Sequence, residues 1–137
     1  MITQLGNDAF GDIIVETIEQ LGVGTQYIKR TNKANTALAF VSLQDDGQRD
    51  FSFYRKPSAD MLYQPENIDD IQIFQDDILH FCSVDLIESD MKYAHEKMIE
   101  KFESVGGTIV FDPNVRLPLW EDKLECQRTI NAFIPKA

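Results

Sequence analysis

The chain has 137 residues, of which 43% are hydrophobic and 26% are charged. This length and composition predict one domain with its own apolar core and exclude a low-complexity or disordered class. The formal net charge of −10 argues against a nucleic-acid partner, because binding to a phosphate backbone needs clustered Lys and Arg. No apolar run approaches the roughly 20 residues of a membrane span, so we expect a cytoplasmic protein without a membrane partner.

The first predicted element is an amphipathic helix after Asn7-Asp8, two residues that favour the N-cap position. Gly22 is expected to end this helix, because glycine readily takes the left-handed conformation that often follows one. Between these limits the apolar side chains recur at helical spacing, at Phe10, Ile13, Ile14, Ile18 and Leu21, with Thr17 on the same face.

An antiparallel hairpin is predicted next. The segments Leu38–Val41 and Phe51–Tyr54 have the character of strands and flank the turn sequence Asp45-Asp46-Gly47-Gln48. Asp-Gly favours a tight turn, because the turn needs a positive φ. Strand alternation places Phe51 and Phe53 on one face, so the hairpin has one face rich in aromatic rings.

A strand, a helix and a second strand then predict a βαβ unit. The segments Ile78–Cys82 and Thr108–Phe111 have the continuous apolar character of buried strands. The helix between them is expected to begin after Ser89 and to end before Gly106. Its predicted apolar face consists of Met91, Ala94, His95, Met98, Ile99 and Phe102.

A last amphipathic helix is predicted over Leu119–Phe133, with Trp120, Leu124, Ile130 and Phe133 as its apolar positions. The chain has two cysteines, Cys82 and Cys126, which are far apart in apolar contexts. Their spacing indicates reduced core thiols and not a disulfide framework or a zinc site.

The two histidines, His80 and His95, lie in a predicted strand and on an apolar helix face. No partner residues accompany them in the sequence, so we interpret both as core or boundary residues and not as metal ligands.

A group of polar residues follows the strand Thr108–Phe111, namely Asp112, Asn114 and Arg116. Ligands of α/β sheets bind just beyond the carboxyl ends of strands. If the extended backbone continues, the three side chains lie on one side and offer a carboxylate, an amide and a guanidinium to one ligand. On these residues alone, an ion pair between Asp112 and Arg116 that pins the loop is about equally favoured.

Four segments of the chain resemble the ribokinase-type (PfkB) carbohydrate kinases, and most closely the bacterial fructokinases. In the family's order, they are LGNDAFG at 5–11, TALAFVSLQDDGQRDFSFYR at 36–55, PSAD at 57–60 and FDPNVRLPLW at 111–120. The resemblance implies an α/β fold with a partial Rossmann-like (ribokinase-like) three-layer body and a small antiparallel β lid. We therefore expect residues 1–137 to form a single partial sugar-kinase domain, with the lid strands within about 27–56.

The resemblance also implies a function: an ATP- and Mg²⁺-dependent transfer of the γ-phosphate to a sugar hydroxyl, with fructose as the favoured sugar. The lid would cover the sugar. The resemblance also implies a possible homodimer formed through the lid. Its aromatic face would either exclude water from the sugar or pack as ordinary core. By resemblance, Arg55, Ser83, Asn114 and Arg116 contact the substrate, and Asp112 anchors its turn.

Several motifs of that family do not occur within the 137 residues. The resemblance places a Gly-Gly loop before Ile2, and the Asn-x-x-Glu and Gly-Ala-Gly-Asp motifs after Ala137. These segments would carry the catalytic base and the groups that hold ATP and magnesium. We therefore expect no catalytic or metal-binding residue in this chain and no phosphate transfer by it alone. The alternative is a noncatalytic, lid-bearing α/β module that associates with another chain through its sheet edges.

Overall fold

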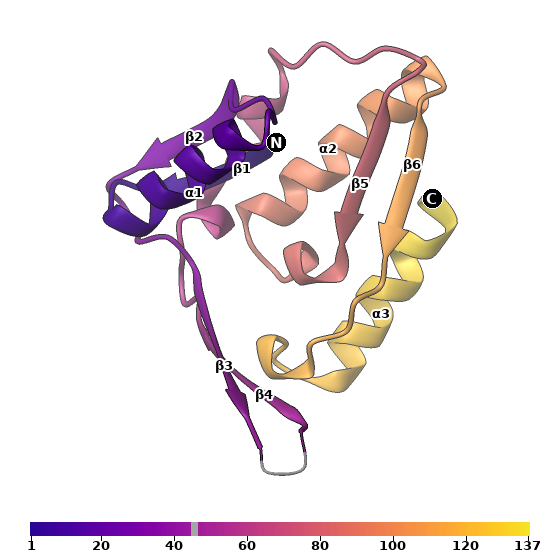
Figure 1. Cartoon of the computed structure of the whole chain (residues 1–137). Coiled ribbons are helices and arrows are strands. Elements are labelled where there is room, and N and C mark those ends of the chain that lie inside the picture. The colour runs from indigo at the N-terminus through magenta and orange to yellow at the C-terminus, as the bar shows by residue number, and fades with distance from the viewer. Residues whose placement is uncertain (45–46) are drawn as a thin grey trace. The chain divides into compact units, whose positions relative to one another are not determined.

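The computed structural model describes residues 1–44 and 47–137. The predicted turn residues Asp45 and Asp46 therefore lie outside the described residues. The chain forms two compact units, Met1–Tyr63 and Gln64–Ala137, whose elements are labelled in Figure 1. None of the described helices is long and apolar enough to cross a membrane.

The first unit opens with a strand–helix–strand motif. The strands β1 (Ile2–Gly6) and β2 (Tyr27–Thr31) pair in parallel, and α1 (Ala9–Gln20) connects them. Asp8 is the N-cap of α1, and Gly22 has a φ of +73° just after the C-cap residue. Both predicted limits of this helix are confirmed.

The sequence did not predict β1, because its five residues include Thr3 and Gln4 and lack a strand-like apolar run. Gln4 is nevertheless buried, since its side-chain amide donates a 2.7 Å hydrogen bond to the carbonyl of Ala59. A distant backbone acceptor thus makes burial of this polar side chain possible.

The predicted hairpin is confirmed as β3 (Leu38–Leu43) and β4 (Arg49–Tyr54), which pair antiparallel. The rings of Phe51 and Phe53 stack on one face, with their centroids 5.9 Å apart. Phe40 and Tyr54 pack edge to face on the other, and both are exposed. Within the range 27–56 that we expected to hold the lid strands, β2 belongs to a different sheet from this hairpin.

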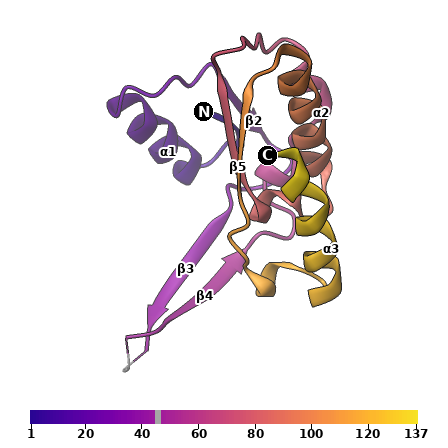
Figure 2. The same ribbon diagram turned by 90° about the vertical axis from the view of Figure 1, so that its right-hand side faces the viewer.

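The second unit contains the predicted βαβ motif, formed by β5 (Ile78–Cys82), α2 (Asp90–Val105) and β6 (Thr108–Asp112), with the two strands parallel. A further helix, α3 (Lys123–Phe133), lies with α2 on one side of the two strands (Figure 2). The core of the unit consists of Phe81, Leu86, Ile99, Trp120, Cys126, Ile130 and Phe133.

The predicted apolar face of α2 is confirmed. Five of its side chains are buried, and His95 is half-buried with Nδ1 2.8 Å from the carbonyl oxygen of Met91. The helix ends at Gly106, which has a φ of +71°, as expected of a C-terminal glycine. Ser89 occupies the N-cap position, but its hydroxyl donates to the carbonyl of Ile87 and accepts no hydrogen bond from the helix amides.

β5 and β6 were predicted as buried strands, but in this unit only one face of each is covered. Phe81 and Phe111 pack into or against the core, whereas Ile78, His80 and Val110 on the opposite face are exposed. A short apolar run indicates a hydrophobic strand but does not show whether neighbouring elements cover one face of that strand or both.

The last helix begins at Lys123 and not at Leu119 as predicted. Leu117–Leu119 forms a short 3₁₀ turn, and the Asp122 carboxylate caps α3 by accepting from the Glu125 amide at 2.8 Å. Leu124, which was predicted on the apolar face, is exposed, whereas Cys126 lies on the buried face.

Candidate functional site

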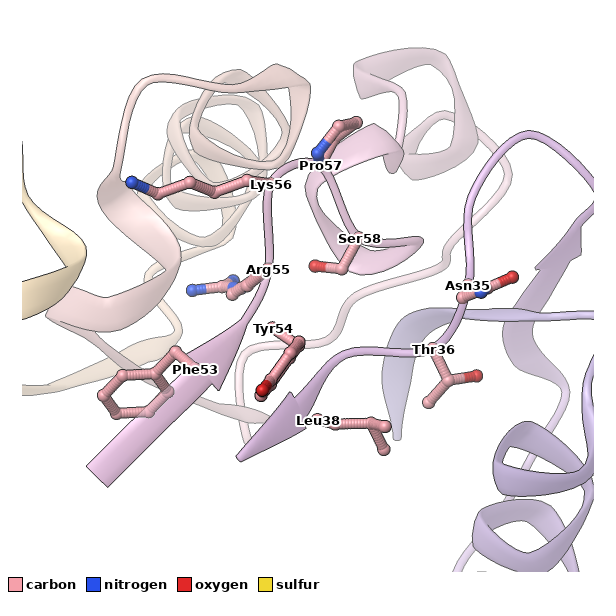
Figure 3. Close-up of a pocket in the computed structure, with 9 residues that line it drawn as sticks. All are labelled: Asn35, Thr36, Leu38, Phe53, Tyr54, Arg55, Lys56, Pro57 and Ser58. Atoms are coloured by element: carbon pink, nitrogen blue, oxygen red, sulfur yellow. The ribbon is translucent and has the colours of Figure 1, made fainter. Parts of the chain in front are cut away.

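A cavity of about 410 Å³ lies in the first unit, where β3 begins and β4 ends (Figure 3). Its size falls within the usual range for small-molecule sites. Polar and aromatic side chains both line it: Asn35, Thr36, Leu38, Phe53, Tyr54, Arg55, Lys56, Pro57 and Ser58. We refer to this cavity as the hairpin pocket.

Arg55, which follows β4 directly, is held by an acid from the next turn. Its Nε donates to Oδ2 of Asp60 at 2.7 Å, and Nη2 contacts the same oxygen. The two side chains are only 8% and 16% exposed. The buried Ser58 hydroxyl donates to the other carboxylate oxygen. These charge-assisted hydrogen bonds fix the orientation of the guanidinium at the pocket wall.

Asp8 holds Thr36, at the opposite edge of the pocket, in place. Its Oδ2 accepts from the Thr36 amide at 2.8 Å, while Oδ1 accepts from the Gly11 amide at 2.9 Å. Hydrogen bonds from these two N–H groups, that of Thr36 foremost, lower the pKa of Asp8, because they favour the charged carboxylate. A Cβ at Gly6 would lie 2.7 Å from the Thr36 nitrogen, so this close approach requires glycine.

In the second unit, the ends of β5 and β6 bring Ser83 to the loop that follows β6. Ser83 is fully buried, and its hydroxyl donates to the carbonyl of Pro113 at 2.8 Å and contacts that of Asn114 at 3.2 Å. Asp112 Oδ1 accepts from the Asn114 amide at 3.0 Å. The hydroxyl and the carboxylate thus both hold the loop backbone in place.

Asp112, Asn114 and Arg116 were expected on one side only if the strand continued. The strand ends at Asp112, so strict alternation ends there too. Arg116 is half-buried, and its Nη1 donates to the carbonyl of Val115 at 3.0 Å. The loop backbone, and not strand alternation, therefore positions the side chains of Asn114 and Arg116.

The sequence analysis did not identify Asp8 and Asp60 as residues of this site. The PSAD segment contains Asp60, and its nearness to Arg55 was an available signal for an ion pair. Asp8 was identified only as a helix cap, since nothing in the sequence connects it to Thr36, 28 residues away.

In the described part of the chain, neither the cysteines nor the histidines belong to a cluster of candidate metal ligands. Among residues 1–44 and 47–137, no group of three or more His, Cys, Asp or Glu side chains could hold a metal ion. Burial raises the pKa of the Cys82 and Cys126 thiols, which keeps them in the protonated, weakly nucleophilic form.

Comparison with known proteins identifies the family. Residues 1–137 match the model of the pfkB family carbohydrate kinases. A curated relative, Probable fructokinase-4 of Arabidopsis thaliana, is 40% identical over 136 residues, which cover 99% of this chain and 42% of the relative. The chain thus spans about two fifths of the length of the curated relatives it matches.

Solved structures agree with this assignment. The fructokinase from Vibrio cholerae O395 in its fructose, ADP and calcium ion bound form has a TM-score of 0.89 at 30% identity, covering 99% of this chain and 44% of that one. The fructokinase with bound ATP from Xylella fastidiosa has a TM-score of 0.79 at 37% identity, covering 89% and 38%. The predicted ribokinase-like α/β fold is confirmed, and the protein belongs to the pfkB family of carbohydrate kinases.

Proposed function

We propose that this chain is part of an ATP-dependent sugar kinase of the fructokinase type, which transfers the γ-phosphate of ATP to a hydroxyl of fructose. The observation that carries the proposal is the match of nearly the whole chain to fructokinases at up to 40% identity. A solved relative that contains fructose and ADP supports the choice of sugar and nucleotide.

The roles of individual residues are part of the proposal. In the first unit, Arg55 would contact the sugar, and its place in the wall of the hairpin pocket supports this role. In the second unit, Ser83, Asn114 and Arg116 would form the substrate side of the loop after β6. The hydrogen bonds from Ser83 to that loop support an ordered placement of Asn114.

ATP would supply the phosphoryl group, and Mg²⁺ would stabilise the charge on it during transfer. The described residues do not fit a magnesium site, because they include no suitable cluster of acidic side chains. We therefore assign no step through the metal, and no catalytic base, to residues of this chain. We expect the 137 residues alone not to phosphorylate sugar.

Two further expectations belong to the proposal. The exposed apolar side chains of the hairpin, among them Phe40, Val41 and Leu43, support a homodimer formed through the lid. We also expect the protein to be cytoplasmic.

A coupled assay of ADP formation with fructose, ATP and Mg²⁺ tests the activity. The complete product of the gene should turn over fructose, whereas the 137-residue chain should not exceed a heat-inactivated control. Arg55→Lys should raise KM for fructose by about tenfold, because lysine cannot reproduce the guanidinium fork. The exposed Arg128→Lys is the matched control. Absence of fructose-dependent ADP formation by the complete product would contradict the proposed activity.

A further inference from the structure

The charges around the hairpin pocket are arranged in two shells. Of the nine residues that line it, Arg55 and Lys56 carry positive charge and none is acidic. Asp60 does not line the pocket, but its carboxylate lies directly behind Arg55 at 2.7 Å. Asp60 therefore offsets the positive charge of Arg55 without itself lining the pocket.

The scaffold, and not Arg55 alone, holds this carboxylate in place. The neighbouring Ala59 amide donates to the carbonyl of Asn35 at 2.8 Å, and the Ala59 carbonyl accepts from the Gln4 side chain at 2.7 Å. Ser58 donates to the carboxylate itself. An incoming anion could therefore not displace Asp60 from Arg55 without disturbing these bonds.

Lys56, the second positive residue of the pocket, differs from Arg55 in exposure and in contacts. Its side chain is exposed, and Figure 3 shows it extending away from Asn35 and Thr36. Within the described part of the chain, no hydrogen bond or ion pair involves its amine. Water screens an exposed ammonium, so Lys56 attracts an anion less strongly than a buried guanidinium without a carboxylate partner would.

We propose that Asp60 is a specificity-determining residue, which makes the hairpin pocket select an uncharged, hydroxyl-rich ligand over a phosphorylated or carboxylated one. It acts through Arg55 and does not touch the ligand, so it is a positioning residue. An anion at Arg55 meets repulsion from Asp60 at close range, and the low exposure of the pair limits screening of that repulsion. A neutral sugar accepts hydrogen bonds without this penalty. The inference rests on the proposed function in treating the pocket as a sugar site.

The test compares Asp60→Asn, which keeps an oxygen acceptor but removes the charge, with Asp60→Glu, which retains the charge. The exposed Asp70→Asn removes the same charge elsewhere and is the matched control. Inorganic phosphate is titrated while the Arg55 Nε–H resonance is followed by NMR. Asp60→Asn should bind phosphate at least about tenfold more tightly than the wild type. Asp60→Glu and Asp70→Asn should resemble the wild type.

A second arm measures binding of fructose and of fructose 6-phosphate to the same proteins. Asp60→Asn should reduce the preference for fructose by at least about tenfold. Unchanged phosphate affinity in Asp60→Asn would overturn the proposal, as would an Asp60→Glu variant that behaves like Asp60→Asn. If phosphate affinity rises as expected but no variant binds fructose, the role of Asp60 stands and the proposed function fails.

Lys56→Gln provides the test if Asp60→Asn does not fold, because the Lys56 side chain is exposed and makes no hydrogen bond or ion pair with the described residues, so its loss should not prevent folding. Since Arg55 is already balanced, the phosphate affinity of the wild type should come from Lys56. The Lys56→Gln variant should therefore lose at least about fivefold in that affinity. An unchanged affinity would overturn the proposal.

Discussion

The two strand–helix–strand motifs of this protein have the same local topology but are held together by different forces. Each has a pair of parallel five-residue strands joined by a helix. In the second unit, α2 buries five side chains, including Ile99 and Phe102. Among the described residues of α1, Gly11 alone is buried, and Phe10 and Ile13 are exposed.

Polar contacts define the first motif instead. Asp8 caps α1, the Asn7 amide donates to the carbonyl of Thr31 at 2.9 Å, and Arg30 pairs with Asp12 at 2.5 Å. The first motif also carries the contact from Asp8 to the edge of the hairpin pocket. One motif is thus stabilised mainly by apolar burial, and the other is positioned by directional hydrogen bonds close to a candidate site.

The largest effect that this comparison predicts is that of Ile99→Ala in α2. Ile99 is fully buried in the core of the second unit, so the substitution should cost about 2–5 kcal/mol through lost burial and a cavity. Urea unfolding followed by circular dichroism measures the loss. A cost well below 1 kcal/mol would mean that apolar burial does not stabilise this motif.

Asp8→Ala should have an intermediate effect, a loss of about 1 kcal/mol, as is typical of an N-cap. Because the folded pKa of Asp8 lies below its ordinary value of 3.8, this stability is fully present above that value. It is lost as the pH falls through the lowered pKa. The stability difference between wild type and variant, measured at several pH values, should therefore shrink in strong acid to the part that a neutral oxygen acceptor still supplies.

Asp8→Asn is the control for charge, since it retains one oxygen acceptor but cannot ionise. Its stability should lie between those of the wild type and Asp8→Ala at neutral pH. A difference between wild type and Asp8→Ala that stays constant down to strong acid would contradict the role of the ionised carboxylate.

The smallest effect is expected for Ile13→Ala in α1, the counterpart of Ile99→Ala. Ile13 is 59% exposed, so the change should stay within about 0.5 kcal/mol. The same urea titration applies. A cost comparable to that of Ile99→Ala would show that the apolar face of α1 is covered in solution and would end the contrast between the motifs.

Periodicity predicted those elements whose side chains repeat at a regular interval. The face of α2 and the paired strands of the hairpin are examples, as is the end of α2 at Gly106. It failed where a polar residue enters a strand, as Gln4 does in β1, and where a 3₁₀ turn delays the start of a helix, as it does before α3. In both cases a hydrogen bond overrides the apolar pattern.

The candidate site divides in the same way. Motif resemblance identified Arg55, and the order of β6 and its polar residues identified Asp112, Asn114 and Arg116. The sequence did not show which groups hold these residues in place. The hydrogen bond from Ser83 to Pro113, for example, joins residues 30 positions apart. A one-dimensional pattern carries no information about such pairs.

The amino-acid order of this protein thus determined its α/β class, its family and most of its helices and strands, since local spacing and motif identity encode these properties. Tertiary structure alone decided which faces are covered and which acid stands behind Arg55. Both depend on distances between groups that the chain brings together only when it folds, and the electrostatic balance of the hairpin pocket depends on such a distance.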